Sequence, residues 1–312
     1  MNPIRIGTRG SALALAQAGW VRRKLEERYP EIKVETVTIK TSGDRFLDTP
    51  IKAIAGKGVF VKEIEEALLS GKIDLAVHSM KDLPTEIPAG LVLAAIPERE
   101  DPRDVLASAG RRTLKDLPPG ARIGTGSLRR RAQILHHRPD LVVEPIRGNI
   151  DTRLNKLERG EVQGLVMAAA GLKRIGCESR ISEYLAPQIC VSAVAQGALG
   201  LECRDGAPVM DQIAFLHYPP TALQVLAERA FLKRLGGGCQ IPVGARAWTD
   251  DDQMRLLGVI CEVDGKRLYR GEIAGSAEDA ERLGRELAER LLKAGAQEVL
   301  ALEEGLFVHG ND

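Results

Sequence analysis

The stretch IGTRGSAL, residues 6–13, has the pattern of a strand that ends in a Gly/Ser/Thr turn and continues into a helix. A similar stretch, IGTGSLRR, occupies residues 123–130. Later in each half, a helix that ends at a glycine is followed by a strand, in LLSGKIDL (residues 68–75) and LERGEVQG (residues 157–164). We interpret these matches as two similar α/β lobes, with chance resemblance as the alternative. If the repeat is real, equivalent strand ends face each other across a cleft, where α/β sheets bind their ligands.

Strands and helices alternate around these stretches, which favours α/β layers with a largely parallel sheet. In the first lobe the expected strands are residues 3–7, 34–40 and 73–77, and the expected helices are residues 12–28 and 61–70. After residue 220 the pattern changes to a helix at 221–235, strands at 243–248, 254–263 and 267–273, and a helix from Ser276 through Lys293. Asp264-Gly265 is a hairpin signal, and Ser276 with Asp279 resembles a capping box.

Three domains are expected from this organisation. The first lobe comprises residues 1–98 and 198–217, because the chain returns to it after the second lobe. The second lobe comprises residues 102–194 and has an arginine-rich cleft face. A small α+β domain, residues 220–312, completes the chain.

The composition excludes several classes of protein. Among 312 residues, aromatic side chains make up only 4%, which argues against a stacking platform for single-stranded nucleic acid. The formal net charge of +1 gives no sign of a DNA or membrane partner. The five cysteines are odd in number and never spaced as CxxC, which indicates a reducing compartment and no zinc site. With no leader-like start and no membrane-length apolar run, we expect a cytoplasmic protein.

Arginine is concentrated between residues 122 and 153. This interval holds seven arginines, no lysine and three acidic residues, a formal balance of +4. Thr125-Gly126-Ser127 opens the helix that carries Arg129–Arg131, so backbone N–H groups and the helix dipole add to the side chains. Successive helical residues are about 100° apart, so at most two of these three arginines can face one ligand. Together with Arg9 and Ser11 at the matching turn, the pattern favours a polyanion cleft over a solvated basic face.

Lys81 and Asp82 lie in HSMKDLP, residues 78–84, which follows the strand expected at residues 73–77. They therefore occupy the carboxyl end of a strand. A carboxylate in an arginine-rich cleft stays ionised and can stabilise a developing cation or shuttle a proton. The alternative is an aspartate that only fixes a turn.

Cys239 lies in LGGGCQIP, residues 235–242. Three glycines cannot hold a helix, and Pro242 stops a regular element from resuming at once. The thiol is thus a candidate for covalent attachment if it can form a thiolate, with an idle loop cysteine as the alternative. The other four cysteines are expected to be structural. The segment IAGKGVF, residues 54–60, lacks the spacing of a phosphate loop and is interpreted as a basic, glycine-rich lid.

Nine segments together resemble the porphobilinogen deaminase family, also called hydroxymethylbilane synthases. In order, from residue 6 to residue 244, they are IGTRGSALAL, KGVFVKEIEEALL, DLAVHSMKDLP, EREDPRD, IGTGSLRRRAQ, IRGNIDTRL, AAAGLKRIG, AVAQGALGLECR and LGGGCQIPVG. Each motif is modest alone, but their shared order and spacing make the resemblance specific. It implies two lobes of periplasmic-binding-protein type with a cleft between them and a small α+β C-terminal domain.

The resemblance implies a dipyrromethane cofactor held by a thioether at Cys239. Four porphobilinogens would be joined to it head to tail with loss of ammonia, and water would release hydroxymethylbilane. Asp82 would be the catalytic residue, holding pyrrole N–H groups and stabilising the azafulvene-like cation that forms as the amine leaves.

The resemblance also implies two sets of binding residues. Each pyrrole bears an acetate and a propionate, so a growing chain is a polyanion that matches the arginine surplus. The expected cofactor ligands are Lys81, Asp82, Thr125, Ser127, Arg129 and Arg130. The expected substrate ligands are Arg9, Ser11, Arg147, Arg153, Arg174 and Phe60. One departure is Gly126, where many relatives carry a second serine, which puts one side-chain hydrogen bond in doubt.

Two other functions remain open from the residues alone. A solute-binding protein would use the same two lobes to close on an anion without chemistry. A nucleic-acid-binding protein would use the arginine surplus, against the low net charge and scarce aromatic residues. We expect a monomer that acts on porphobilinogen, with no metal site and no nucleic-acid or membrane partner.

Overall fold

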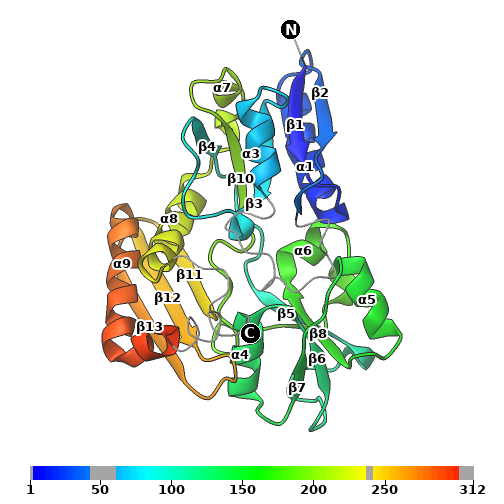
Figure 1. Cartoon of the computed structure of the whole chain (residues 1–312), viewed down its shortest axis with the longest axis vertical. Helices are drawn as coiled ribbons and strands as arrows, with labels where there is room; N and C mark the ends of the chain where they lie inside the picture. Colours follow the sequence, from blue (N-terminus) through cyan, green and yellow to red (C-terminus); the bar gives the residue numbers. More distant parts are fainter. Residues whose placement is uncertain (1–2, 43–60, 237–241, 302–312) are drawn as a thin grey trace, which may run out of the picture. The chain divides into compact units, whose positions relative to one another are not determined.

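The computed structural model describes residues 3–42, 61–236 and 242–301. Its contacts group the chain into two compact units (Figure 1). The first unit contains Met1–Glu100 and Gly197–Ala222, and the second contains Asp101–Gln196 and Leu223–Asp312. In the described part of the chain, no helix is long and apolar enough to cross a membrane. The three expected domain ranges remain a prediction.

The first unit is built on a five-stranded sheet with the order β2-β1-β3-β10-β4 (Figure 1). Its strands are β1 (Ile4–Thr8), β2 (Val34–Thr38), β3 (Leu75–Ser79), β4 (Leu91–Ala95) and β10 (Leu199–Arg204). β1 pairs in parallel with β2 and β3, and β10 is antiparallel to its neighbours β3 and β4. Its helices are α1 (Ala12–Arg28), α3 (Lys62–Leu69) and α7 (Val209–Ile213). Leu25 of α1 and Leu75 of β3 are completely buried in the core between helix and sheet.

The second unit contains a five-stranded sheet with the matching order β7-β6-β8-β5-β9. Its strands are β5 (Asp104–Ser108), β6 (Arg122–Gly124), β7 (Val142–Glu144), β8 (Gly164–Ala168) and β9 (Glu183–Tyr184). The associated helices are α4 (Leu128–His137), α5 (Ile150–Glu158) and α6 (Ala169–Arg174). In both sheets three parallel strands are followed by an antiparallel one, β10 or β5. The expected pair of similar α/β lobes is therefore confirmed.

The second unit also contains a three-stranded antiparallel sheet of β11 (Val243–Asp250), β12 (Gln253–Cys261) and β13 (Leu268–Ser276). The helices α8 (Pro219–Arg234) and α9 (Ala280–Leu291) accompany it. A side chain at Gly258 would lie 2.7 Å from Phe231, so this glycine lets α8 pack closely on the sheet. Gly265 has a φ of 78°, which suits the predicted hairpin turn. The small α+β C-terminal region is thus confirmed.

Short turns connect these elements. They are the 3₁₀ turns η2 (Met80–Asp82), η3 (Ala109–Arg111), η4 (Glu178–Arg180), η5 (Ala214–Leu216) and η6 (Ala277–Asp279), and the short π-helix η7 (Leu292–Ala296). The helix expected from Ser276 through Lys293 consists of η6, α9 and the first residues of η7. The Ser276 side chain makes no capping hydrogen bond, so the capping-box prediction is wrong. Asp279 instead accepts a hydrogen bond from Arg282 Nη2 at 2.7 Å.

One strand boundary differs from its prediction in a way that affects the site. The strand expected at residues 73–77 starts two residues later and ends at Ser79. Its end is extended because β10 pairs with it there, with Leu199 opposite Ser79 and Gly200 opposite His78. His78 therefore lies within β3, and Asp82 follows the strand by one short turn.

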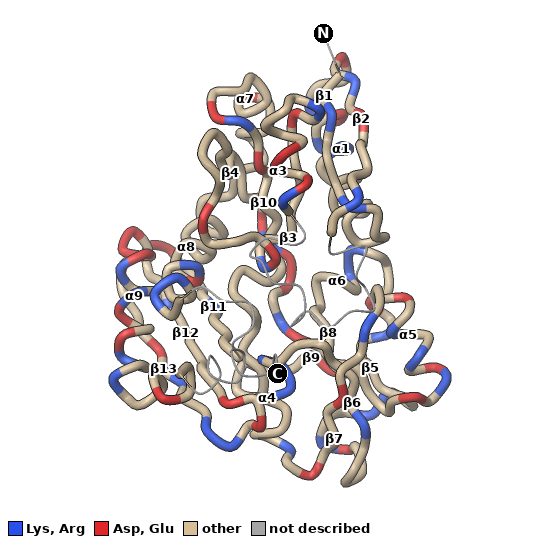
Figure 2. The backbone as a smooth tube through the Cα atoms, viewed as in Figure 1, with Lys and Arg blue, Asp and Glu red and all other residues tan. Residues whose placement is uncertain are grey.

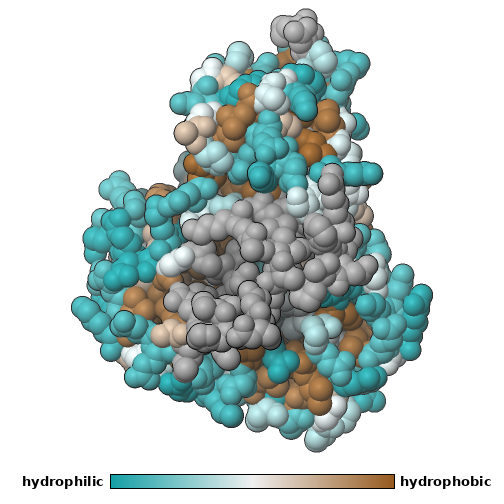
Figure 3. Space-filling view, in the orientation of Figure 1, coloured by the Kyte–Doolittle hydropathy of each residue, from teal (hydrophilic) through white to brown (hydrophobic). Residues whose placement is uncertain are grey.

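The surface carries charges of both signs. Acidic and basic residues alternate along α9 (Figure 2), where Arg285 pairs with Glu281 at 2.7 Å. The coloured residues on the face seen in Figure 3 are mostly hydrophilic, with hydrophobic residues between them. Such a surface is typical of a globular protein.

Candidate functional site

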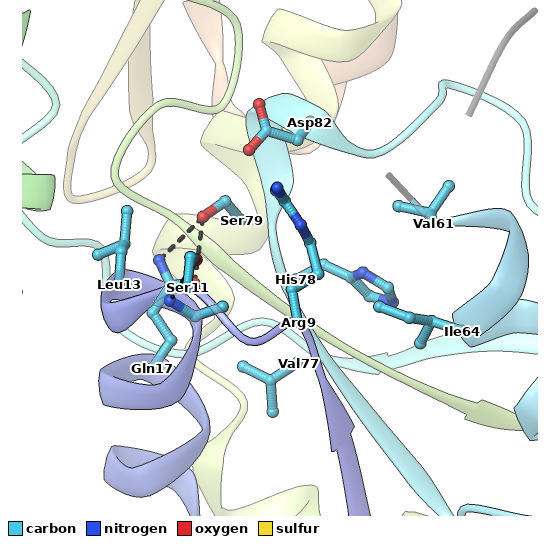
Figure 4. Close-up of a pocket in the computed structure, with 11 residues that line it drawn as sticks. Arg9, Ser11, Leu13, Gln17, Val61, Ile64, Val77, His78, Ser79 and Asp82 are labelled. Atoms are coloured by element: carbon cyan, nitrogen blue, oxygen red, sulfur yellow. Dashed lines mark hydrogen bonds between the residues drawn. The ribbon is translucent and has the colours of Figure 1, made fainter. Parts of the chain in front are cut away.

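A small pocket of about 60 Å³ lies in the first unit at the carboxyl ends of β1 and β3. Its polar lining is formed by Arg9, Ser11, Gln17, His78, Ser79 and Asp82 (Figure 4). In this view the guanidinium of Arg9 extends toward the carboxylate of Asp82 (Figure 4). The structure thus brings together three of the residues selected from the sequence, namely Arg9, Ser11 and Asp82.

Local hydrogen bonds fix one wall of this pocket. Ser11 caps α1 by accepting a hydrogen bond from Ala14 N at 3.3 Å. Thr8, at the end of β1, donates to Ala14 O at 3.1 Å. One turn further along α1, Gln17 donates to Ser79 Oγ at 2.8 Å (Figure 4). The first turns of α1 are therefore held against the carboxyl end of β3.

Asp82 is exposed at the end of η2, and the residues around it are fixed. Met80, two residues earlier, is 1% exposed and donates its backbone N–H to Ala198 O at 3.0 Å. A side chain at Gly200 would lie 2.3 Å from Met80 Sδ, so only a glycine leaves room for this anchor. Lys81 lies on the same turn, partly buried. An exposed carboxylate on a firmly anchored turn is suited to act on a bound molecule.

His78 and Glu202 form a buried pair that sequence reasoning missed. His78 Nε2 lies 2.9 Å from Glu202 Oε2, and the two side chains are 4% and 0% exposed. They come from adjacent strands, β3 and β10, but are 124 residues apart in the sequence. No local pattern could have connected them.

The arginine-rich segment in the second unit is organised around Asp104, the first residue of β5. Its completely buried carboxylate accepts hydrogen bonds from Arg129 Nη1 at 2.6 Å and from Arg130 Nε at 2.8 Å. Gln196 Nε2 also donates to it, at 2.9 Å. Burial alone would raise the pKa of Asp104, but the positive charges of the two arginines and these hydrogen bonds hold it well below its ordinary value.

Arg129 and Arg130 are themselves only 5% and 7% exposed. Arg129 also donates to Val191 O at 2.5 Å, and Arg130 donates to Gln196 Oε1 at 3.1 Å. Arg131 makes a separate contact, donating to Val143 O at 2.6 Å. Two of the three consecutive arginines therefore converge on one carboxylate, as the helical spacing predicts, and the third does not.

Arg153 adds a third guanidinium to this cluster. Its Nε donates to Gly148 O at 2.8 Å, and its pKa is lowered to about 10 by burial and by the positive charge of Arg130. Arg129, Arg130 and Arg153 together outnumber Asp104 by two positive charges. A partly buried excess of this kind suits carboxylate or phosphate groups.

The turn before α4 completes the cluster. Ser127 caps α4 by accepting a hydrogen bond from Arg130 N at 3.4 Å, and Thr125 Oγ1 accepts from Ser127 N at 3.3 Å. A side chain at Gly126 would lie 3.2 Å from Ile146 O, so this turn passes close to the neighbouring loop. Of the remaining predicted ligands, Arg147 lies between β7 and α5, and Arg174 ends α6.

The C-terminal sheet contacts this cluster through Gly244 of β11. A side chain there would lie 2.9 Å from the carbonyl oxygens of Val191 and Ser192 and 3.1 Å from Arg129 Cδ. Gly244 follows Cys239 by five residues. Cys239 itself, Phe60 and the glycine-rich segment 54–60 lie outside the described residues.

The four described cysteines are free thiols, and Cys190, Cys203 and Cys261 are buried. Burial raises the pKa of Cys203 to about 11 and that of Cys261 to about 12. Thiols that resist ionisation are poor nucleophiles. Within the described ranges, no group of three or more His, Cys, Asp or Glu residues could hold a metal ion.

Two family models match the chain. One is described as "Porphobilinogen deaminase, dipyromethane cofactor binding domain" and matches residues 4–212, and the other is the porphobilinogen deaminase C-terminal domain, matching residues 222–293. The chain belongs to the porphobilinogen deaminase family. This membership confirms the family, the enzyme class and the dipyrromethane cofactor that the sequence motifs predicted.

Relatives of the family match almost the whole chain. The porphobilinogen deaminase of Pelobacter propionicus is 53% identical over 298 residues, which cover 95% of this chain and 96% of that protein. That of Geotalea uraniireducens is 53% identical over 302 residues, covering 96% and 95%. Among solved structures, the periplasmic aliphatic sulphonate binding protein of Escherichia coli is 18% identical over 75% of this chain and 70% of its own, with a TM-score of 0.39. The fold assignment rests on the matching strand orders of the two sheets.

Proposed function

We propose that this chain joins four porphobilinogens head to tail, with loss of ammonia, on a dipyrromethane attached to Cys239, and then releases hydroxymethylbilane. The observation that carries this proposal is the excess of guanidinium groups at Arg129, Arg130 and Arg153. A substrate whose every ring bears an acetate and a propionate needs such an excess.

The described residues fit the cofactor. The two surplus positive charges match carboxylates, and the lowered pKa of Arg153 indicates a charge that an anion would stabilise. Gly244 contacts Arg129 and follows Cys239 by five residues, a span of at most about 18 Å of extended chain. We therefore assign the cofactor carboxylates to Arg129 and Arg130, with Thr125 and Ser127 at the start of α4. When bound, the dipyrromethane supplies the terminal ring to which the first porphobilinogen is joined.

The described cysteines support Cys239 as the attachment point. Three of them are buried, and the raised pKa values of Cys203 and Cys261 make those thiols poor nucleophiles. Cys239 directly follows three glycines, Gly236–Gly238, so no side chains precede it within three residues. A thioether needs an accessible thiol that can ionise, and we assign it to Cys239.

Asp82 is assigned the catalytic role. Its carboxylate accepts the pyrrole N–H of porphobilinogen and stabilises the positive charge that spreads over the ring as the C–N bond breaks and ammonia leaves. Because η2 is anchored through Met80, the carboxylate is already in place when this charge develops. A preorganised group of this kind is worth on the order of 10²–10³ in rate.

Arg9 and Ser11 are assigned to the side-chain carboxylates of the substrate. Both line the pocket with Asp82, and Ser11 caps the start of α1, where backbone N–H groups favour anions. Lys81, Arg147, Arg153 and Arg174 are proposed as further ligands of the growing chain or cofactor, and Phe60 as a cover of the site. We also propose that the protein acts as a monomer in the cytoplasm. Its net charge of +1 supports the absence of a nucleic-acid or membrane partner.

The proposal is tested by incubating the purified chain with porphobilinogen and following substrate, ammonia and product together. We expect four ammonia molecules to be released for each hydroxymethylbilane formed. Binding of porphobilinogen without ammonia release would instead identify an anion-binding protein and refute the proposal.

A further inference from the structure

A buried, titratable pair borders the pocket that contains Asp82. His78 lines this pocket, and its Nε2 lies 2.9 Å from Glu202 Oε2. Nothing in the reaction assigned to Asp82 uses either residue. His78 is nevertheless four residues from Asp82 along the chain, near the end of the strand that precedes the catalytic turn.

Because the pair is buried, its stability depends on whether it carries a net charge. Glu202 is completely buried, and its Oε1 has no hydrogen-bond partner in the part of the chain that the structure describes. A carboxylate removed from water is costly unless a positive charge or a proton compensates it. The pair is therefore most favourable when it holds one proton and has no net charge, as imidazolium with carboxylate or as imidazole with carboxylic acid.

Charged side chains of several described elements lie near the pair. From α3, Glu65 approaches it: burial raises the pKa of Glu65, the negative charge of Glu202 raises it further, and His78 opposes this effect. Arg9 and Asp82 share the pocket with His78. β4 contributes no ionisable residue. The other charged residues of α3 are Lys62 and Glu66, which are exposed, and Glu63, which accepts a hydrogen bond from Ser42 N at 2.8 Å.

The pair is also mechanically connected to Asp82. His78 and Glu202 join β3 to β10 through their side chains, next to the backbone pairing of His78 with Gly200. The following residue pairs, Ser79 with Leu199 and Met80 N with Ala198 O, continue this contact up to the catalytic turn. A shift of β3 against β10 would therefore move Asp82.

We propose that His78 is a positioning residue for the reaction at Asp82, and that the proton it shares with Glu202 sets the charge beneath this pocket. The proposal rests on the function assigned to Asp82. The hydrogen bond from His78 to Glu202 holds the end of β3 in place both when the pair carries the shared proton and when it has lost it. Loss of that proton leaves one net negative charge below the pocket, which stabilises the cation formed from porphobilinogen. Turnover is thus expected to rise with pH as the pair loses its proton.

The first test compares His78→Gln and Glu202→Gln with Asp74→Asn. Asp74 belongs to the same unit and pairs with Arg5 at 2.8 Å, but it does not line the pocket, so its loss controls for general destabilisation. Turnover is measured from about pH 5.5 to about pH 9, the range in which histidine usually titrates. We expect both pair variants to lose the rise with pH and to fall about tenfold or more in kcat, while Asp74→Asn keeps the profile. A wild-type profile in His78→Gln, whatever its amplitude, would overturn the proposal.

A second measurement does not depend on turnover. The imidazole signal of His78 is followed by NMR during a pH titration of the wild-type chain and of Asp82→Asn, with His78→Gln to assign it among the five histidines. Because coupling between two charges is reciprocal, removing the Asp82 charge should move the His78 titration to lower pH. An unchanged titration would overturn the proposal. This readout would still report on the pair if the chain failed to make hydroxymethylbilane, so failure of the assigned function would be recognised separately.

Discussion

Arg130 donates through Nε to Asp104 Oδ1 at 2.8 Å, with Arg130 only 7% exposed and Asp104 completely buried. Arg129 donates to the other carboxylate oxygen at 2.6 Å. One acid thus fixes the direction of two adjacent arginines on α4. A buried acid with two arginines leaves a formal excess of one positive charge, to which we assign a carboxylate of the cofactor.

Replacing Asp104 by Asn should destabilise the second unit. Two buried guanidinium groups would lose their shared counter-charge, and breaking such a pair costs about 3–5 kcal/mol. Equilibrium unfolding in urea measures this difference. Asp140→Asn is the matched control, because its ion pair with Arg138 is solvent-exposed and such pairs contribute little to stability. Equal stability of the two variants would contradict the central place given to Asp104.

The pH dependence of this stabilisation follows from the lowered pKa of Asp104. A carboxyl whose pKa is lower in the folded than in the unfolded state contributes stability above the unfolded value, about 3.9, and loses it as pH falls through the folded value. The stability difference between wild type and Asp104→Asn should therefore be constant near neutral pH and shrink only in strong acid. Unfolding curves at several pH values measure it. A difference that already disappears near neutral pH would mean that Asp104 is not an ionised partner of the two arginines.

Replacing Arg129 or Arg130 by Gln should prevent loading of the cofactor, whereas Arg131→Gln should not. The first two side chains converge on Asp104, but Arg131 donates to Val143 O on the neighbouring strand β7. Intact mass spectrometry after incubation with porphobilinogen reports the loaded fraction directly. Melting temperatures separate loss of binding from loss of folding. Equal loading of all three variants would show that the converging pair is not the cofactor site.

Asp82→Asn should retain the fold and lose at least about 10²–10³ of the turnover rate, because the carboxylate acts on charge that develops mainly in the transition state. Asp82 is exposed, so its amide replacement leaves no buried group unpaired. Asp211→Asn, an exposed acid on α7 of the same unit, serves as control. Normal turnover of Asp82→Asn would remove Asp82 from the catalytic role.

Much of the fold could be predicted because its signals are local. The turns at Ser11 and Ser127 are readable from a strand end, a capping hydroxyl and a helix start within eight residues, and both cap their helices as such a pattern implies. The hairpin at Gly265 is equally local, since it depends on one residue with positive φ.

The partners of the site residues could not be predicted in the same way. Asp104 meets Gln196 across 92 positions in the sequence, and His78 meets Glu202 across 124. Such contacts depend on which strands become neighbours, and β10 enters the first sheet only after the chain has passed through the second. The same pairing extended β3 to Ser79, beyond its predicted end. The motif resemblance selected Arg129 and Arg130 as candidate ligands, but it did not reveal the buried Asp104 that holds them.

The central claim is that a dipyrromethane is bound covalently at Cys239. It is tested most directly by the intact mass of the denatured protein after incubation with porphobilinogen, beside a Cys239→Ser variant. We predict an excess equal to one dipyrromethane in the parent and the bare polypeptide mass in the variant. A bare mass for the parent, or an excess that persists in Cys239→Ser, would contradict the account.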